Sequence, residues 1–227
     1  MINSMNKFTG HEISLFQNFI CTKEFRLNLL KKILPVWADV INPYPVIINY
    51  DTDIYADEVR SLYEKYIENL HFQQDLNRDW GAPILDFFSI TDSPYILYLC
   101  EDYQFSDKLT RDKFSEIFDE YKENNCGHLM LTRVWKYAEE HWHKNSKKGK
   151  NLWLFHSSES PYWQFAAAGL FEREVYKQAV GETIGFGPGM IGIDKLEQSG
   201  LTQRDIMCCC LTDILMTHEQ PSGTSER

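Results

Sequence analysis

Acidic side chains follow three of the short apolar runs in this sequence, at the point where each run ends. Asp51-Thr-Asp53 comes after a β-branched run, Asp75 after a weaker run, and Glu101-Asp102 directly after six apolar residues. If the runs are parallel strands, their carboxyl ends meet at one edge of the sheet, where ligands bind. Crowded carboxylates repel one another, which favours a cation or a hydrogen-bonded ligand, and Mg²⁺ or Mn²⁺ is the common solution. Asp51 and Asp53 are equally well explained as turn initiators.

Strand-like and helix-like patterns alternate along the first hundred residues and would position these side chains. We expect strands over 13–20, 46–50, 71–74 and 95–100, and helices over 23–34, 55–70 and 83–90. Pro35 is expected to end the first helix and Pro83 to open the third. Strands that alternate with helices predict parallel βαβ units. The expected fold class is therefore α/β, with a mostly parallel central sheet flanked by helices.

The alternation is looser beyond residue 106. We expect a helix over 107–124, strands over 128–132 and 152–155, and a helix over 171–180. Residues 206–216 are apolar with no clear period, and residues 218–227 read as a flexible tail. We therefore expect a single domain over 1–217, divided into a first half at 12–105 and a second half at 106–217.

Charge and composition exclude several classes of protein. The formal net charge of −10 counts against a broad nucleic-acid-binding surface, and a hydrophobic fraction of 43% excludes intrinsic disorder. The basic run at 144–150 contains Gly, Asn and Ser and is interpreted as a solvated loop. No apolar stretch predicts a membrane span or a signal peptide, so we expect a cytoplasmic protein. The six cysteines match no zinc-ligand spacing and are expected to be reduced.

The run Ser93-Pro-Tyr-Ile-Leu-Tyr-Leu-Cys-Glu-Asp-Tyr-Gln-Phe105 resembles the segment around the D-x-D motif of GT-A glycosyltransferases of the family 2 type. In that family an apolar strand delivers acids to a metal ion and to the sugar diphosphate. The upstream segments follow in a similar order, and Ala166-Ala-Ala-Gly-Leu-Phe-Glu-Arg-Glu-Val-Tyr176 resembles the acceptor-side segment. The resemblance extends over roughly residues 12–200 and implies a GT-A fold.

The resemblance implies roles for the residues at matching positions. Those expected to bind the nucleotide sugar are Thr22, Arg26, Asp51, Asp53, Trp80 and Glu101. Asp102 and His218 are expected to bind the metal ion. Cys100 stands where the first acid of the motif is expected, so a full D-x-D is absent, and a thiol is a poor ligand for Mg²⁺.

The chemistry that the resemblance implies also needs a base. A divalent ion stabilises the leaving diphosphate as a Lewis acid, and an inverting enzyme uses a carboxylate to take the proton of the acceptor hydroxyl. The sequence does not choose among Glu159, Glu172, Glu174, Glu182, Asp194 and Glu197. Glu182 and Asp194 are taken as the first candidates, Glu182 because it lies in the glycine-rich segment 181–192. The G-x-G-x-x-G within that segment is a poor dinucleotide motif, because no strand precedes it.

Aromatic residues near 160 indicate an acceptor site. Tyr162 and Trp163 follow Pro161, and flat rings of this kind stack on sugars. We therefore assign both to acceptor binding.

The resemblance implies a glycosyltransferase that depends on Mn²⁺ or Mg²⁺, moves a hexosyl or similar group, and is of the inverting type. A UDP-sugar is the first choice of donor, and a glycan, a lipid-linked molecule or a protein is the acceptor. Two alternatives stay open. A nucleotidyltransferase usually has a glycine-rich phosphate loop after its first strand, which residues 22–26 lack. A catalytically inactive nucleotide-sugar-binding protein of the same fold is kept open by Cys100.

Overall fold

The structure is a computed structural model, and it describes residues 8–134, 146–159, 168–187 and 206–218. Its strands are β1 (Ile13–Phe19), β2 (Val46–Tyr50), β3 (Leu70–Gln73), β4 (Tyr95–Tyr98), β5 (Tyr103–Phe105), β6 (His128–Val134), β7 (Lys147–Lys148), β8 (Leu152–His156), β9 (Gly169–Glu172), β10 (Met207–Leu211) and β11 (Met216–His218). Its helices are α1 (Glu24–Ile41), α2 (Ala56–Tyr66), α3 (Gly81–Phe87), α4 (Arg111–Glu123) and α5 (Arg173–Gly181), with a short 3₁₀ turn at Ser157–Glu159.

The described strands form a large sheet in the order β3-β2-β1-β4-β9-β6-β10-β8-β7. Strands β3, β2, β1 and β4 are mutually parallel, as their alternation with helices predicts. Strand β9 runs antiparallel to both β4 and β6, and β10 is parallel to β6. The carboxyl ends of the first four strands therefore share one edge, which we call the carboxyl edge. The halves expected at 12–105 and 106–217 both contribute to this sheet, because β9 pairs with β4.

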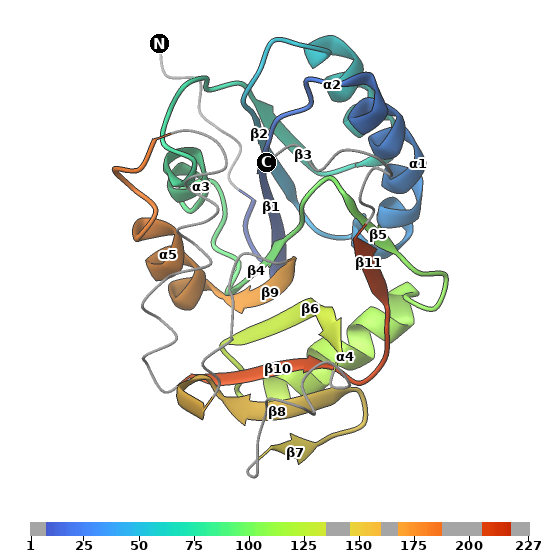
Figure 1. The fold of residues 1–227 in the computed structure, drawn as a ribbon, viewed down its shortest axis with the longest axis vertical. Helices are drawn as coiled ribbons and strands as arrows, with labels where there is room; N and C mark the ends of the chain where they lie inside the picture. Colours follow the sequence, from blue (N-terminus) through green and yellow to red (C-terminus); the bar gives the residue numbers. More distant parts are fainter. Residues whose placement is uncertain (1–7, 135–145, 160–167, 188–205, 219–227) are drawn as a thin grey trace.

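Helices cover both faces of the sheet (Figure 1). One buried cluster joins α1, α2 and α4 to side chains such as Leu15, Ile48 and Leu99. A second joins α3 and α5 to side chains such as Phe16, Ile47 and Ile96. Neighbouring strand residues thus point to opposite layers. The α/β layered fold expected from the sequence is confirmed.

Two helix predictions were wrong in an informative way. Helix α1 continues through Pro35, because the turns after it bury Trp37, Val40 and Ile41 and so stabilise the helix despite the missing amide. The segment expected as a helix at 171–180 begins as strand β9, which is central in the sheet, and only Arg173 starts α5. A short apolar run does not distinguish a buried strand from a helix by its period.

Other boundaries shifted, and three short strands had not been predicted. Helix α2 ends at Tyr66, α3 begins at Gly81 rather than at Pro83, and α4 begins at Arg111 with Thr110 capping the amide of Lys113 at 3.2 Å. The basic run expected as a loop contains β7, and β5 pairs with β11 in a small second sheet. His218, the first residue of the expected tail, belongs to β11. Among the helices described, none is long and apolar enough to cross a membrane.

Candidate functional site

The carboxyl edge brings together most of the described residues that were assigned to nucleotide-sugar binding. Thr22 follows β1 and is exposed, and Asp53 is exposed with its carbonyl accepting the amide of Ala56 at 3.4 Å, so it starts the turn into α2. Asp51 follows β2, and Glu101 and Asp102 follow β4 in a turn before β5. The parallel pairing of β3, β2, β1 and β4 places the strand ends before these acids on one edge of the sheet.

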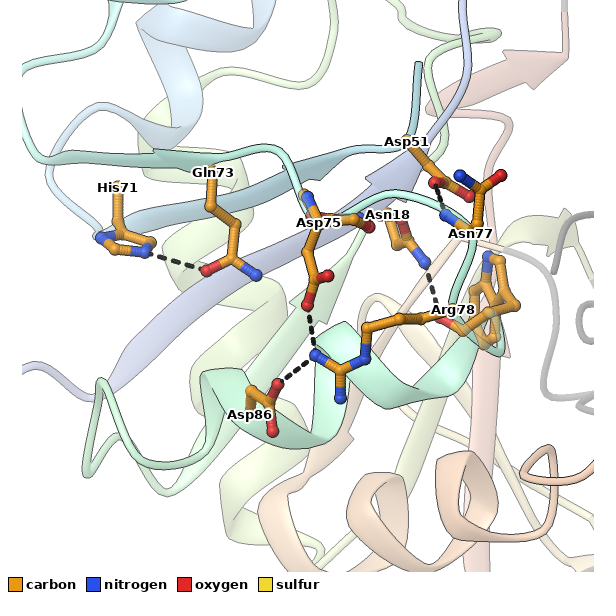
Figure 2. A network of polar contacts seen from close by, with 10 residues as sticks. Asn18, Asp51, His71, Gln73, Asp75, Asn77, Arg78 and Asp86 are labelled. Carbon is orange, nitrogen blue, oxygen red and sulfur yellow. Dashed lines mark hydrogen bonds and ion pairs between the residues drawn. The ribbon is translucent and has the colours of Figure 1, made fainter. Parts of the chain in front are cut away.

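Asp51 is anchored to the loop after β3 (Figure 2). Its Oδ1 accepts the backbone N–H of Asn77 at 2.9 Å, and Asn77 has a left-handed backbone with φ of 62°. Gln74 Nε2 donates to the carbonyl of Thr52 at 3.0 Å and fixes the same loop. Partial burial raises the pKa of Asp51, and the Asn77 amide opposes that rise. One carboxylate oxygen is thus engaged by the protein, and the other accepts no hydrogen bond from the part of the chain that the structure describes, so a ligand could donate to it.

Two buried asparagines carry this anchoring into the sheet, and the sequence reasoning missed both. Asn49 of β2 donates from Nδ2 to Asn18 Oδ1 at 3.0 Å, and its Oδ1 accepts the amide of Asp75 at 2.8 Å. Asn18 of β1 donates in turn to the carbonyl of Trp80 at 2.5 Å. The signal that could have found them is an amide side chain near the end of an otherwise apolar strand.

Trp80 is a core residue rather than an open binding surface. Its side chain is 3% exposed and packs edge-on against Tyr98, with ring centroids 5.9 Å apart. Its indole Nε1 has no hydrogen-bond partner among the described residues. Arg78, two residues earlier, forms ion pairs with Asp75 and with Asp86, the latter at 2.6 Å, and ties the loop to α3. The assigned role of Trp80 in donor binding stays a prediction.

Arg26 and Glu101 form an ion pair between the first turn of α1 and the turn after β4. The carboxyl side chain of Glu101 is 9% exposed, whereas that of Arg26 is 37% exposed. Burial and the neighbouring Asp102 raise the pKa of Glu101 to about 7, although Arg26 opposes the rise. Glu101 therefore orients a guanidinium whose remaining N–H groups can serve an anion.

Cys100 lies where its strand position predicts. Leu99 packs into the layer of α1 and α2, while Cys100 packs against the layer of α3 and α5 and donates to Tyr98 at 3.3 Å. Burial and the carboxylates of Asp102 and Glu101 raise its pKa well above that of a free thiol. A neutral thiol is thus favoured at the position where a D-x-D motif would have its first acid.

Asp102, the carboxylate expected to bind a divalent ion, lies in the turn between β4 and β5. Strand pairing sets His218 of β11 opposite Tyr103 of β5, next to Asp102 along the chain. Within the described ranges no group of three His, Cys, Asp or Glu could hold a metal ion. Mg²⁺ is commonly bound by one or two carboxylates together with substrate phosphates. Asp102 and His218 therefore stay predicted ligands, for an ion that a bound diphosphate would also hold.

Glu182 lies at the carboxyl end of α5, exposed to solvent, in a turn that contacts the start of α3. Asp79 accepts the amides of Gly185 and Gly187 at 3.0 and 2.7 Å, and the amide of Trp80 donates to the carbonyl of Gly187 at 3.2 Å. The turn after α5 is thereby placed at the carboxyl edge. Tyr162, Trp163 and Asp194 lie outside the described residues.

Comparison with known proteins gives matches in structure only. No family model and no curated protein matches the sequence. TarS residues 1–349 from S. aureus, a GT-A-type glycosyltransferase solved in complex with UDP-GlcNAc, superposes with a TM-score of 0.63 at 10% identity, over 94% of this chain and 60% of that one. Its complex with UDP gives a TM-score of 0.54 at 11% identity, over 91% and 58%.

A nucleotidyltransferase also has this fold. The 4-diphosphocytidyl-2C-methyl-D-erythritol synthase from Anaerococcus prevotii superposes with a TM-score of 0.53 at 13% identity, over 92% of this chain and 88% of that one. The present chain spans about 60% of the TarS 1–349 chain. At such low identities the matches show the fold, which is the expected GT-A type of α/β fold.

Proposed function

We propose that this chain is a glycosyltransferase that takes its sugar from a nucleoside-diphosphate sugar, with a UDP-sugar as the first choice. The observation that carries the proposal is the carboxyl edge, where the Asp51–Asn77 anchor, the Arg26–Glu101 pair and Asp102 come together. The likeness to TarS, which was solved with UDP-GlcNAc and with UDP, supports the choice of uridine.

Different described residues are assigned to different parts of the donor. The free oxygen of Asp51 accepts a hydrogen bond from the base or the ribose, in a loop held by Asn77. Arg26 donates to the diphosphate while Glu101 holds its orientation. Thr22 and Asp53 border this site on exposed loops, and Trp80 supports it from the core.

A divalent ion, Mn²⁺ or Mg²⁺, would be held by Asp102 and the donor phosphates, with His218 as a further ligand. When bound, it supplies Lewis-acid stabilisation of the leaving diphosphate. Asp102→Ala should then abolish the Mn²⁺-dependent part of donor binding and leave the metal-free part intact. Calorimetry with and without Mn²⁺ measures both parts, and an unchanged Mn²⁺ effect would remove Asp102 from the metal site.

The acceptor side is assigned to the second half of the chain. Glu182 is proposed as the base that takes the proton of the acceptor hydroxyl, with Asp194 as the alternative, in a single inverting displacement. Tyr162 and Trp163 would stack on the acceptor, which is a glycan, a lipid-linked molecule or a protein.

The likeness to the synthase from Anaerococcus prevotii supports a nucleotidyltransferase as a second candidate. Product analysis separates the two. A glycosyltransferase incubated with UDP-GlcNAc and no acceptor should slowly release UDP and free sugar. Pyrophosphate release from UTP and a sugar phosphate would favour the nucleotidyltransferase, and no turnover despite UDP binding would favour an inactive sugar-nucleotide-binding protein.

A further inference from the structure

Asp79 connects two segments that are more than a hundred residues apart in the sequence. It lies between β3 and α3, and its two carboxylate oxygens accept the amides of Gly185 and Gly187 from the turn after α5. Hydrogen bonds from backbone amides to an ionised carboxylate are shorter and stronger than neutral ones. We call this arrangement, Asp79 with the amides of Gly185 and Gly187, the Asp79 clamp.

The backbone of the turn is shaped to fit the clamp. Gly185 and Gly187 have φ of 91° and 87°, which side-chain-bearing residues rarely adopt. Alternating glycines in this conformation point two amides toward the same anion. The sequence Gly185-Phe-Gly187 therefore supplies a pair of donors that one carboxylate satisfies.

Close packing holds the turn against the first residues of α3. A Cβ added to Gly81 would overlap the hydroxyl of Thr183 and lie 2.9 Å from the carbonyl of Val180. Thr183 is fully buried and donates to that carbonyl at 2.7 Å. The turn after α5 is thus held in one position against the start of α3.

The clamp continues into the polar contacts of the donor site. The carbonyl of Trp80 accepts Asn18 Nδ2 from β1, and its amide donates to Gly187. Asn18 is bonded to Asn49, which fixes the loop that carries Asn77 and hence Asp51. Hydrogen bonds, together with the short loop from Asp75 to Asn77, therefore link the proposed nucleoside contact to the turn that begins at Glu182.

We infer that Asp79 is a positioning residue, which sets the turn 182–187, and with it Glu182, relative to the bound donor. The inference rests on the proposed function. Both carboxylate oxygens of Asp79 accept backbone amides of the turn, so it acts through the turn. Loss of the clamp should lower turnover while leaving nucleotide affinity unchanged.

The test compares Asp79→Ala and Asp79→Asn with the control Asp86→Ala, which removes a carboxylate of α3 that contacts Arg78 and not the turn. Hydrogen–deuterium exchange at residues 184–187 should be faster by about tenfold or more in Asp79→Ala, intermediate in Asp79→Asn, and unchanged in Asp86→Ala. The kcat of UDP-GlcNAc hydrolysis should fall by about tenfold in Asp79→Ala, with the Kd for UDP within about twofold of wild type.

Wild-type exchange in Asp79→Ala would overturn the clamp itself. Faster exchange with an unchanged kcat would overturn its positioning role. If the wild type neither binds UDP nor hydrolyses the donor, the proposed function fails and the positioning role with it, while the exchange comparison in nucleotide-free protein still decides whether the clamp exists.

Discussion

Glu101 combines two properties that oppose each other, since its carboxyl side chain is only 9% exposed and yet it pairs with a cation. Burial and the charge of Asp102 raise the pKa of Glu101 more than Arg26 lowers it, so this pKa rises from 4.5 to about 7. A carboxyl group with a raised pKa binds its proton more tightly in the folded state. The free energy of unfolding therefore falls as the pH rises from about 4.5 to about 7, and this contribution is flat above that range.

Replacing Glu101 should remove this pH dependence. The free energy of unfolding of Glu101→Gln minus that of the wild type should be about 2 kcal/mol higher at about pH 8 than at about pH 5.5. Urea unfolding of the nucleotide-free protein at both pH values measures the difference. Glu116→Gln is the control, since Glu116 is exposed and its pKa is lowered by Lys150. An equal effect of Glu101→Gln at both pH values would contradict the assigned pKa.

Substitutions of Cys100 distinguish an active site from an inactive one. If Asp102 with its neighbours suffices, the wild type should hydrolyse UDP-GlcNAc, and Cys100→Ser should lose stability but keep that activity. The sulfur packs between Tyr98 and the α3 layer, so the loss should be about 1 kcal/mol. Sugar release only after Cys100→Asp, measured by the same assay, would instead identify the wild type as an inactive protein.

At the scale of elements, α3 and α5 meet through a glycine. A methyl group at Gly81 has no room between Thr183 and Val180. Gly81→Ala should therefore destabilise the fold by about 1–3 kcal/mol, as overpacking does. Gly181→Ala is the matched control, because an added Cβ there meets nothing within 4 Å, and we expect no loss. Thermal unfolding of both variants checks this, and equal midpoints would contradict the close contact of the two helices.

The elements that could be predicted from the sequence are those with a long or unambiguous period. Strands β1, β2 and β4 and helix α4 were found, and the strand ends located Asp51 and Glu101 correctly. Strand β9 was missed because Gly169–Glu172 is too short to show a period and pairs with strands far away in the sequence. The Asn18–Asn49 pair and the Asp79 clamp were missed for a related reason, since each joins segments whose proximity only the tertiary fold creates.

At the scale of the whole molecule, a net charge of −10 opposes the approach of an anionic donor. Local features must therefore attract the diphosphate, and the proposal assigns this to Arg26 and to an ion at Asp102. The same fold serves a glycosyltransferase and a nucleotidyltransferase, so function depends on the residues at the carboxyl edge and not on the fold.

Calorimetric titration of UDP into the wild type and into Asp51→Ala tests the central claim most directly, which is that the carboxyl edge binds a nucleotide. We expect the wild type to bind UDP with or without Mn²⁺, and Asp51→Ala to bind at least about tenfold more weakly under both conditions. Asp119→Ala, which removes an exposed carboxylate on α4, should bind like the wild type. No binding of UDP by the wild type, or equal affinity in Asp51→Ala, would contradict the account.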